Sequence, residues 1–144
     1  MANALGSVSS GGAPNCDLLS DNIYIALFTS GYTPNRGTHD FYDDTSAGSN
    51  EVANGSGYTT NGILQSNKTL AIGSNIITFD NTVDPAWTSA TFSCTQAVLV
   101  DRTPGTDATR PLIGYIDFGA TASPSNGTLT IAYSGSGIVT ITNA

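Results

Sequence analysis

Short apolar segments recur along the chain, and turn signals rich in Gly, Ser and Asn separate them at intervals of roughly eight to twelve residues, a spacing that predicts a β-sandwich or barrel. Nine strands are predicted in this way. They cover residues 22–29, 58–64, 69–72, 76–79, 90–94, 97–101, 112–118, 128–133 and 138–142. No segment offers a long crossover helix, so parallel pairing is disfavoured. We therefore predict an all-β fold: an antiparallel β-sandwich, jelly-roll-like, of eight to nine strands.

Composition supports this prediction. Only 10% of the 144 residues are charged, and the chain holds a single Glu and a single Lys, so the residues that favour amphipathic helices are scarce. A chain of this length fits one domain, which we place at residues 16–144. Residues 1–15 are small and polar, without hydrophobic periodicity, and we predict a flexible N-terminal arm that becomes ordered on a neighbouring subunit or remains a frayed terminus.

Some segments allow finer predictions. Residues 22–29 are apolar on both faces, which is typical of a strand buried from both sides. Residues 128–133 alternate with a period of two, and the glycine-rich residues 134–137 predict a hairpin into 138–142. Residues 73–75 predict a similar link between their neighbouring strands. Thr38 is expected to cap one helical turn with Phe41 pointing inward, within a long irregular loop.

Charge limits the classes of partner. The formal net charge is -7, and the four basic residues are scattered, so neither nucleic acid nor an anionic membrane is an expected partner. No apolar run reaches the length of a membrane helix, and no secretion signal is expected at the start of the chain. We expect the two cysteines, Cys16 and Cys94, to be free thiols rather than a disulfide pair.

The sequence offers little for catalysis. His39 is the one histidine, and we expect it to be a hydrogen-bonded loop residue. Residues 135–137 read as a hairpin turn rather than a nucleophile elbow. We therefore expect neither an enzyme nor a cofactor.

Two groups of residues invite a binding hypothesis. Asp40, Asp43 and Asp44 are close in sequence and would offer oxygen ligands to Ca²⁺, although a solvated loop is the favoured interpretation. Trp87 is expected to close the end of the core; the alternative is a stacking surface for sugars. Such a surface would use four aromatic residues: Tyr32, Tyr42, Tyr58 and Trp87.

Several motifs together resemble small proteins encoded among the structural genes of tailed bacteriophages. They are DNIYIALFTS at 21–30, YTPN at 32–35, THDFYDD at 38–44, NEV at 50–52, GYT at 57–59 and PLIGYIDFG at 111–119. The resemblance spans most of residues 21–142 and is weaker over 66–108. It implies a virion protein, most like a capsid cement or decoration protein.

That resemblance sets the functional expectations. The chain would bind the outer surface of the head and stabilise the shell, with the major capsid protein and itself, as a homotrimer, for partners; it would be made in the host cytoplasm. The residues expected to contact partners are Ala2, Leu5, Val8, Pro14, Phe41 and Tyr42. The alternative is a host-recognition or carbohydrate-binding module on a phage tail or fibre, which would use the aromatic surface described above.

Overall fold

The computed structural model describes residues 16–142, and within them the fold is all-β. The strands are β1 (Ile23–Phe28), β2 (Ile63–Leu64), β3 (Lys68–Gly73), β4 (Ile76–Asn81), β5 (Ala86–Thr91), β6 (Cys94–Asp101), β7 (Leu112–Ala122), β8 (Ser125–Thr130) and β9 (Val139–Thr142). Three short helical segments accompany them: η2 (Tyr42–Thr45), α1 (Ala47–Asn50) and η3 (Asp107–Thr109).

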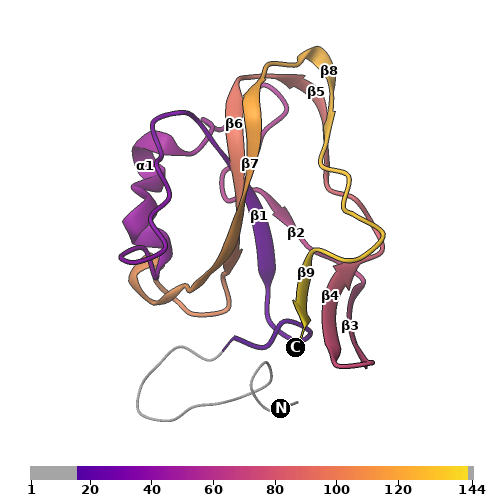
Figure 1. Ribbon diagram of the computed structural model, residues 1–144. Coiled ribbons are helices and arrows are strands. Elements are labelled where there is room, and N and C mark those ends of the chain that lie inside the picture. Colours follow the sequence, from indigo (N-terminus) through magenta and orange to yellow (C-terminus); the bar gives the residue numbers. More distant parts are fainter. Residues whose placement is uncertain (1–15, 143–144) are drawn as a thin grey trace.

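The strands form three antiparallel sheets (Figure 1). The largest has the order β2-β1-β6-β7, the second β3-β4-β9, and the third pairs β5 with β8. Strand β1 lies along β6 with Ile23 opposite Asp101 and Phe28 opposite Gln96, and this pairing forms the centre of the molecule. The predicted antiparallel, sandwich-like all-β fold is confirmed.

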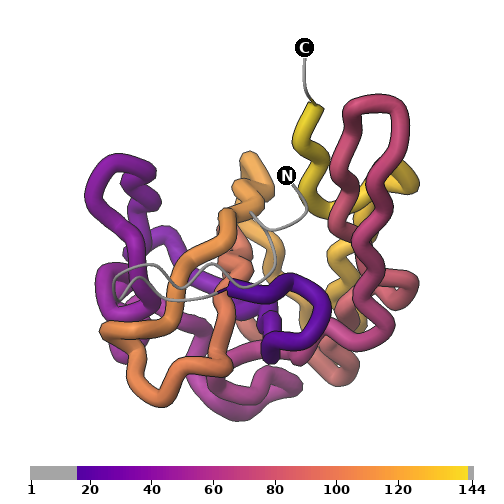
Figure 2. Tube along the Cα trace, turned by 90° about the horizontal axis from the view of Figure 1, so that it is seen from below, coloured from indigo at the N-terminus to yellow at the C-terminus, as the bar shows by residue number. Residues whose placement is uncertain are grey.

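The four-stranded sheet is covered on both faces. In Figures 1 and 2 the segment that contains α1 lies on one side of it, and β3, β4 and β9 lie on the other. Ile23, Ile25 and Leu27 pack in the cluster between the sheets, whereas Ala26 and Phe28 pack in a second cluster beneath the α1 segment. The prediction that residues 22–29 are buried from both sides is therefore confirmed.

The predicted strand bounds differ from the observed ones by one to four residues in most cases, and three predictions differ more. Within 58–64 only Ile63–Leu64 is strand, because Gly57, Asn61 and Gly62 have positive φ angles that interrupt extended backbone. The predicted strand at 90–94 spans the end of β5, a reversal at 92–93 and the first residue of β6. The predicted strand at 128–133 begins earlier, at Ser125, and ends at Thr130.

The two predicted hairpins have different outcomes. β3 and β4 form a hairpin in which Ser74 and Asn75 take positive φ angles, as the link at 73–75 predicted. The prediction of a hairpin across 134–137 is wrong. The Gly137 N–H donates to the Ser134 carbonyl at 2.8 Å, so the chain does turn, but β8 pairs with β5 and β9 pairs with β4.

The predicted helical turn is displaced by a few residues. It runs over η2 and is preceded by Phe41 rather than Thr38, and the side chain that points inward is Tyr42, with Phe41 half-buried. The predicted N-terminal arm, residues 1–15, lies outside the described residues. Among residues 16–142, no helix has the length and apolarity needed to cross a bilayer.

Candidate functional site: the free edge of the central sheet

Strand β7 forms one edge of the four-stranded sheet. Among the strands that the structure describes, it pairs with β6 alone, but at its start the Leu112 N–H donates to the Asp40 carbonyl at 2.9 Å. Toward its end Gly119 has a φ angle of +68°, and its N–H donates to the Asp117 carboxylate at 2.8 Å. The free and extended part of the edge is therefore residues 113–118, about 20 Å of chain. An unpaired edge presents a row of backbone N–H and C=O groups to any chain that approaches it.

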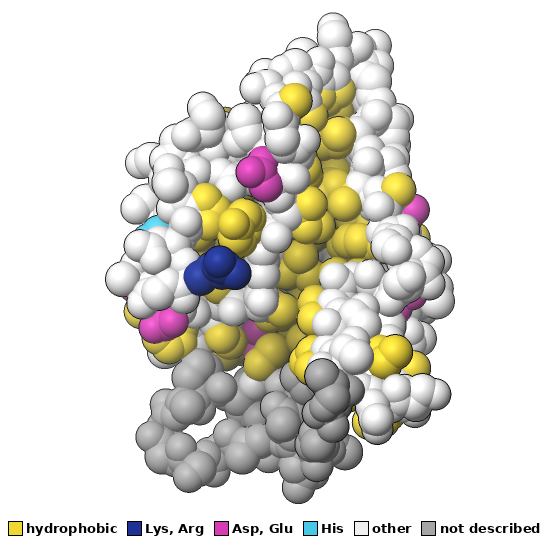
Figure 3. All heavy atoms as spheres, viewed as in Figure 1, with side chains coloured by type: hydrophobic (Ala, Val, Ile, Leu, Met, Phe, Trp, Pro, Cys, Tyr) yellow, Lys and Arg dark blue, Asp and Glu magenta, His cyan; other side chains and the backbone are white. Residues whose placement is uncertain are grey.

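Apolar side chains follow this edge on the face toward the second sheet. They pack against the core and yet are only partly buried, and they form what we call the apolar stripe: Ile113, Ile116, Phe118, Ala122, Leu129, Tyr133, Ile138 and Val139. Figure 3 shows hydrophobic side chains running down this face of the molecule. Asp117 is the one charged residue of β7, and β8 and β9 contain none, so the stripe is apolar and nearly uncharged.

A groove of about 590 Å³ follows the other face of β7. Its floor includes Leu112 and Tyr115, and Tyr115 is 46% exposed. The opposite wall comes from the loop after β1, where the ring of His39 stacks on Tyr32 at 5.7 Å and its Nδ1 lies 3.3 Å from the Tyr32 hydroxyl. The prediction that His39 is a hydrogen-bonded loop residue is confirmed.

Glu51 fixes the segments that follow this wall in the chain. Its carboxylate accepts hydrogen bonds from the Tyr42 hydroxyl at 2.9 Å, the Tyr58 hydroxyl at 2.6 Å and the Asn61 N–H at 2.5 Å. Burial, followed by the nearby Glu51 charge, raises the pKa of both tyrosines. The one glutamate of the chain therefore joins η2, α1 and the turn before β2.

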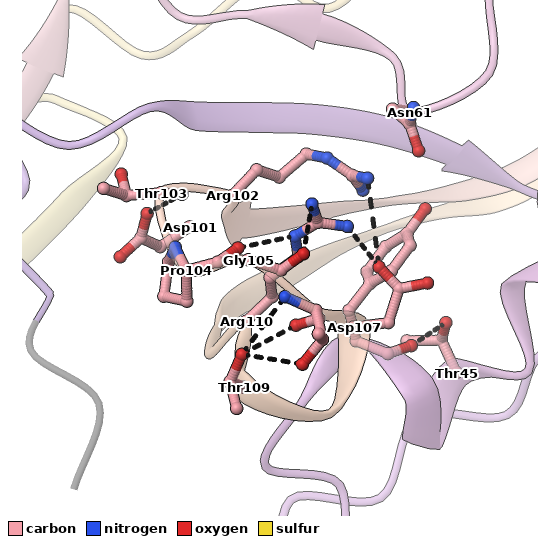
Figure 4. Close-up of polar contacts among 12 residues, drawn as sticks. Thr45, Asn61, Asp101, Arg102, Thr103, Pro104, Gly105, Asp107, Thr109 and Arg110 are labelled. Atoms are coloured by element: carbon pink, nitrogen blue, oxygen red, sulfur yellow. Dashed lines mark hydrogen bonds and ion pairs between the residues drawn. The ribbon is translucent and has the colours of Figure 1, made fainter. Parts of the chain in front are cut away.

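A second polar cluster holds the loop between β6 and β7 (Figure 4). Asp107 forms ion pairs with Arg110 and with Arg102, the latter at 3.9 Å. The Arg102 guanidinium also lies 4.9 Å from the centre of the Tyr42 ring, close enough for a cation–π contact. This loop and η2 are thereby tied to each other beside the start of β7.

The three aspartates considered as calcium ligands, Asp40, Asp43 and Asp44, do not come together as a metal site in the structure. Asp44 accepts hydrogen bonds from the Asp40 and Phe41 N–H groups at 2.9 and 3.0 Å, and these bonds lower its pKa. Its carboxylate is thus used to cap η2, while Asp43 is exposed. In residues 16–142 no three His, Cys, Asp or Glu side chains converge as a metal would require, so the structure adds no support to the calcium hypothesis, over which a solvated loop is favoured.

The four aromatic rings of the alternative, sugar-binding interpretation are buried, so they do not form an exposed stacking surface. The exposed fractions are 6% for Tyr32, 1% for Tyr42, 2% for Tyr58 and 3% for Trp87. Trp87 instead packs on Tyr58 with the ring centres 6.4 Å apart, as the core-closing interpretation predicted.

Of the predicted partner contacts, Tyr42 is therefore unsuitable as well. The backbone of Phe41 bridges to Pro111, and its side chain is half-buried. Ala2, Leu5, Val8 and Pro14 lie outside the described residues.

Both cysteines are free, as predicted. Burial raises the pKa of the Cys16 thiol to about 12 and that of Cys94 to about 11. A thiol with such a pKa is a poor nucleophile at neutral pH, because little of it is ionised.

The edge of β7 was missed in the sequence because period-two patterns mark the faces of a strand and not its neighbours. What this edge offers chemically is backbone hydrogen bonding and apolar contact area. No protein-family model, curated protein or solved structure matches the chain.

Proposed function

We propose that this chain is a structural protein of a tailed-bacteriophage virion that binds the outer surface of the capsid and stabilises the shell. The observation that carries the proposal is the free edge of β7, flanked by the apolar stripe on one face and by the Tyr115 groove on the other. Motifs that resemble phage structural proteins lie at this place, since PLIGYIDFG spans residues 111–119.

A cement protein works by adhesion repeated in many copies. Each contact can be modest, because a symmetric shell presents the same site hundreds of times and subunits that also contact one another bind with avidity. Edge pairing supplies main-chain hydrogen bonds, and the neighbouring apolar surface adds buried area. The net charge of -7 would keep such a protein away from packaged DNA. The major capsid protein is the proposed partner, with self-association as a homotrimer.

Co-sedimentation with purified heads that lack the protein tests this proposal. The chain should bind to saturation with a fixed ratio to the major capsid protein, and decorated heads should resist heating better than bare ones. Tyr115→Asp places a charge beside the β7 edge and should lower the bound ratio several-fold. Ile72→Asp, at a residue 62% exposed on β3, is the matched control and should bind like the parent chain. Binding that does not saturate, or equal binding by both variants, would contradict the proposal.

Host recognition is the second function to consider, because the groove joins the exposed ring of Tyr115 to Arg36, Asn35 and Asp40. Aromatic rings with nearby polar groups are typical of sugar-binding clefts. Copy number separates the two functions. Immunogold labelling at a tail tip, with a handful of copies per particle and binding to host glycans, would favour recognition over cementing.

A further inference from the structure

The outer edge of β7 has the geometry to accept one more strand. The Asp101 N–H donates to the Pro111 carbonyl at 3.0 Å, so alternate residues of β6 direct their N–H groups toward β7. Gly114 lies opposite Leu99 in this register, which leaves the Tyr115 N–H directed away from β6. A strand added there would place its side chains alternately over the apolar stripe and over the Tyr115 groove.

Charge favours one kind of occupant over another. Two whole copies of the chain, each with a net charge of -7, repel one another when their surfaces meet. Residues 1–15 contain no charged side chain, so all of the charged side chains are in residues 16–144. Residues 1–15 can therefore approach another copy without the electrostatic repulsion that acts between the charged domains of two copies.

The segment also starts at a suitable place and has a suitable length. Cys16 lies near Asp101, whose charge helps to raise the pKa of its thiol, and Asp101 is bonded to the residue before β7. The segment therefore leaves the domain at the end of the sheet where β7 begins. Residues 2–14 span about 43 Å when extended, enough to cover the free edge at residues 113–118, about 20 Å, and to bridge the distance from the neighbouring copy.

We propose that residues 2–8 of one copy add as a strand to the free edge of β7, residues 113–118, in a second copy of this chain, with residues 9–15 as the connection to the domain. Ala2, Ala4 and Val8 would then face the apolar stripe, and the odd-numbered residues, Leu5 and Ser7 among them, would face the groove. Paired main-chain groups provide the affinity, while the alternation of side chains sets the register. The proposal needs no capsid, so it can fail while the proposed function stands, and the reverse is equally possible.

Sedimentation of the full-length protein over about a hundredfold range of concentration tests the pairing. The parent chain should associate as its concentration rises. Val8→Asp places a carboxylate over the apolar stripe and should weaken the association at least tenfold, by about 1.4 kcal/mol or more. Ser7→Asp adds the same charge at the neighbouring position, over the groove that contains Arg36, and should change the association constant less than about threefold. Neither substitution lies in the described domain, so at concentrations where all three proteins are monomeric both variants should keep the parent's melting temperature.

Hydrogen exchange on the same samples locates the contact. The amide of Tyr115 should become protected as the concentration rises in the parent and in Ser7→Asp, and should stay unprotected in Val8→Asp. Protection that is independent of concentration in a monomer would mean that the segment pairs with its own β7, which overturns the copy-to-copy proposal. Association that both variants retain in full, or a parent chain that stays monomeric with an unprotected Tyr115 amide, would overturn it as well.

Discussion

Replacing Glu51 by alanine should be among the most damaging single changes in this protein. The carboxylate accepts three hydrogen bonds, and after its removal the Tyr42 hydroxyl and the Asn61 N–H lose the acceptor that each has in the structure. Hydrogen bonds to charged groups contribute about 1.5–3 kcal/mol each. We expect Glu51→Ala to lower the free energy of unfolding by about 3–5 kcal/mol, against the 5–15 kcal/mol that is typical of a whole domain.

Urea unfolding followed by circular dichroism measures this change, provided that the slope of the transition is similar in all variants. Tyr42→Phe removes one donor and leaves the carboxylate two others, so it should cost about 1 kcal/mol. Tyr58→Phe should cost more, about 2–3 kcal/mol, because it also leaves the buried Leu27 N–H without the hydroxyl that accepts its hydrogen bond. Glu51→Gln keeps one carbonyl oxygen and should lie between these values. A loss below about 1 kcal/mol for Glu51→Ala would refute the role of this carboxylate as the link between η2, α1 and the turn before β2.

Three further predictions follow from the described residues. Gly62 has a φ angle of +76°, and a Cβ built there would lie 1.9 Å from a carbonyl oxygen of β1, so Gly62→Ala should unfold or severely destabilise the protein in thermal melts, whereas Gly48→Ala, with open space around it, should not. Burial raises the pKa of Asp101, so the stability that this carboxyl contributes is present at low pH and is lost as the pH rises through its folded-state pKa. Asp101→Asn should therefore flatten this part of the curve of unfolding free energy against pH and stabilise the protein at pH 7. A variant with the same curve as the parent would contradict this. Alkylation of Cys16 and Cys94 at pH 8 should be at least tenfold slower in the folded than in the urea-unfolded protein, since their folded pKa values are about 12 and 11; equal rates would show that burial does not protect them.

The sequence predicted what depends on local chemistry. The two-sided burial of β1 follows from an apolar run without alternation, and the hairpin between β3 and β4 follows from residues that tolerate positive φ angles. Both predictions are confirmed, because each depends on properties that a few adjacent residues carry by themselves.

The pairing of strands depends on contacts between distant parts of the chain, which no local sequence pattern contains. A turn formed at 134–137, yet the strands on either side of it joined different sheets, because the core contacts of β8 and β9 lie with β5 and β4. Glu51 likewise gave no signal in the sequence. Its importance comes from Tyr42 and Tyr58, one before it and one after it in the chain, which the alternative sugar-binding interpretation placed on an exposed surface.

The pairing of β1 with β6 affects how the chain is made. Ile23 meets Asp101, which is translated 78 positions later, so β1 leaves the ribosome long before its central neighbour exists. During that interval an apolar segment with no polar face remains uncovered, and contacts of such long sequence separation form slowly. Productive expression should therefore depend on whatever shields β1 in the nascent chain, such as a holding chaperone or a reduced growth temperature.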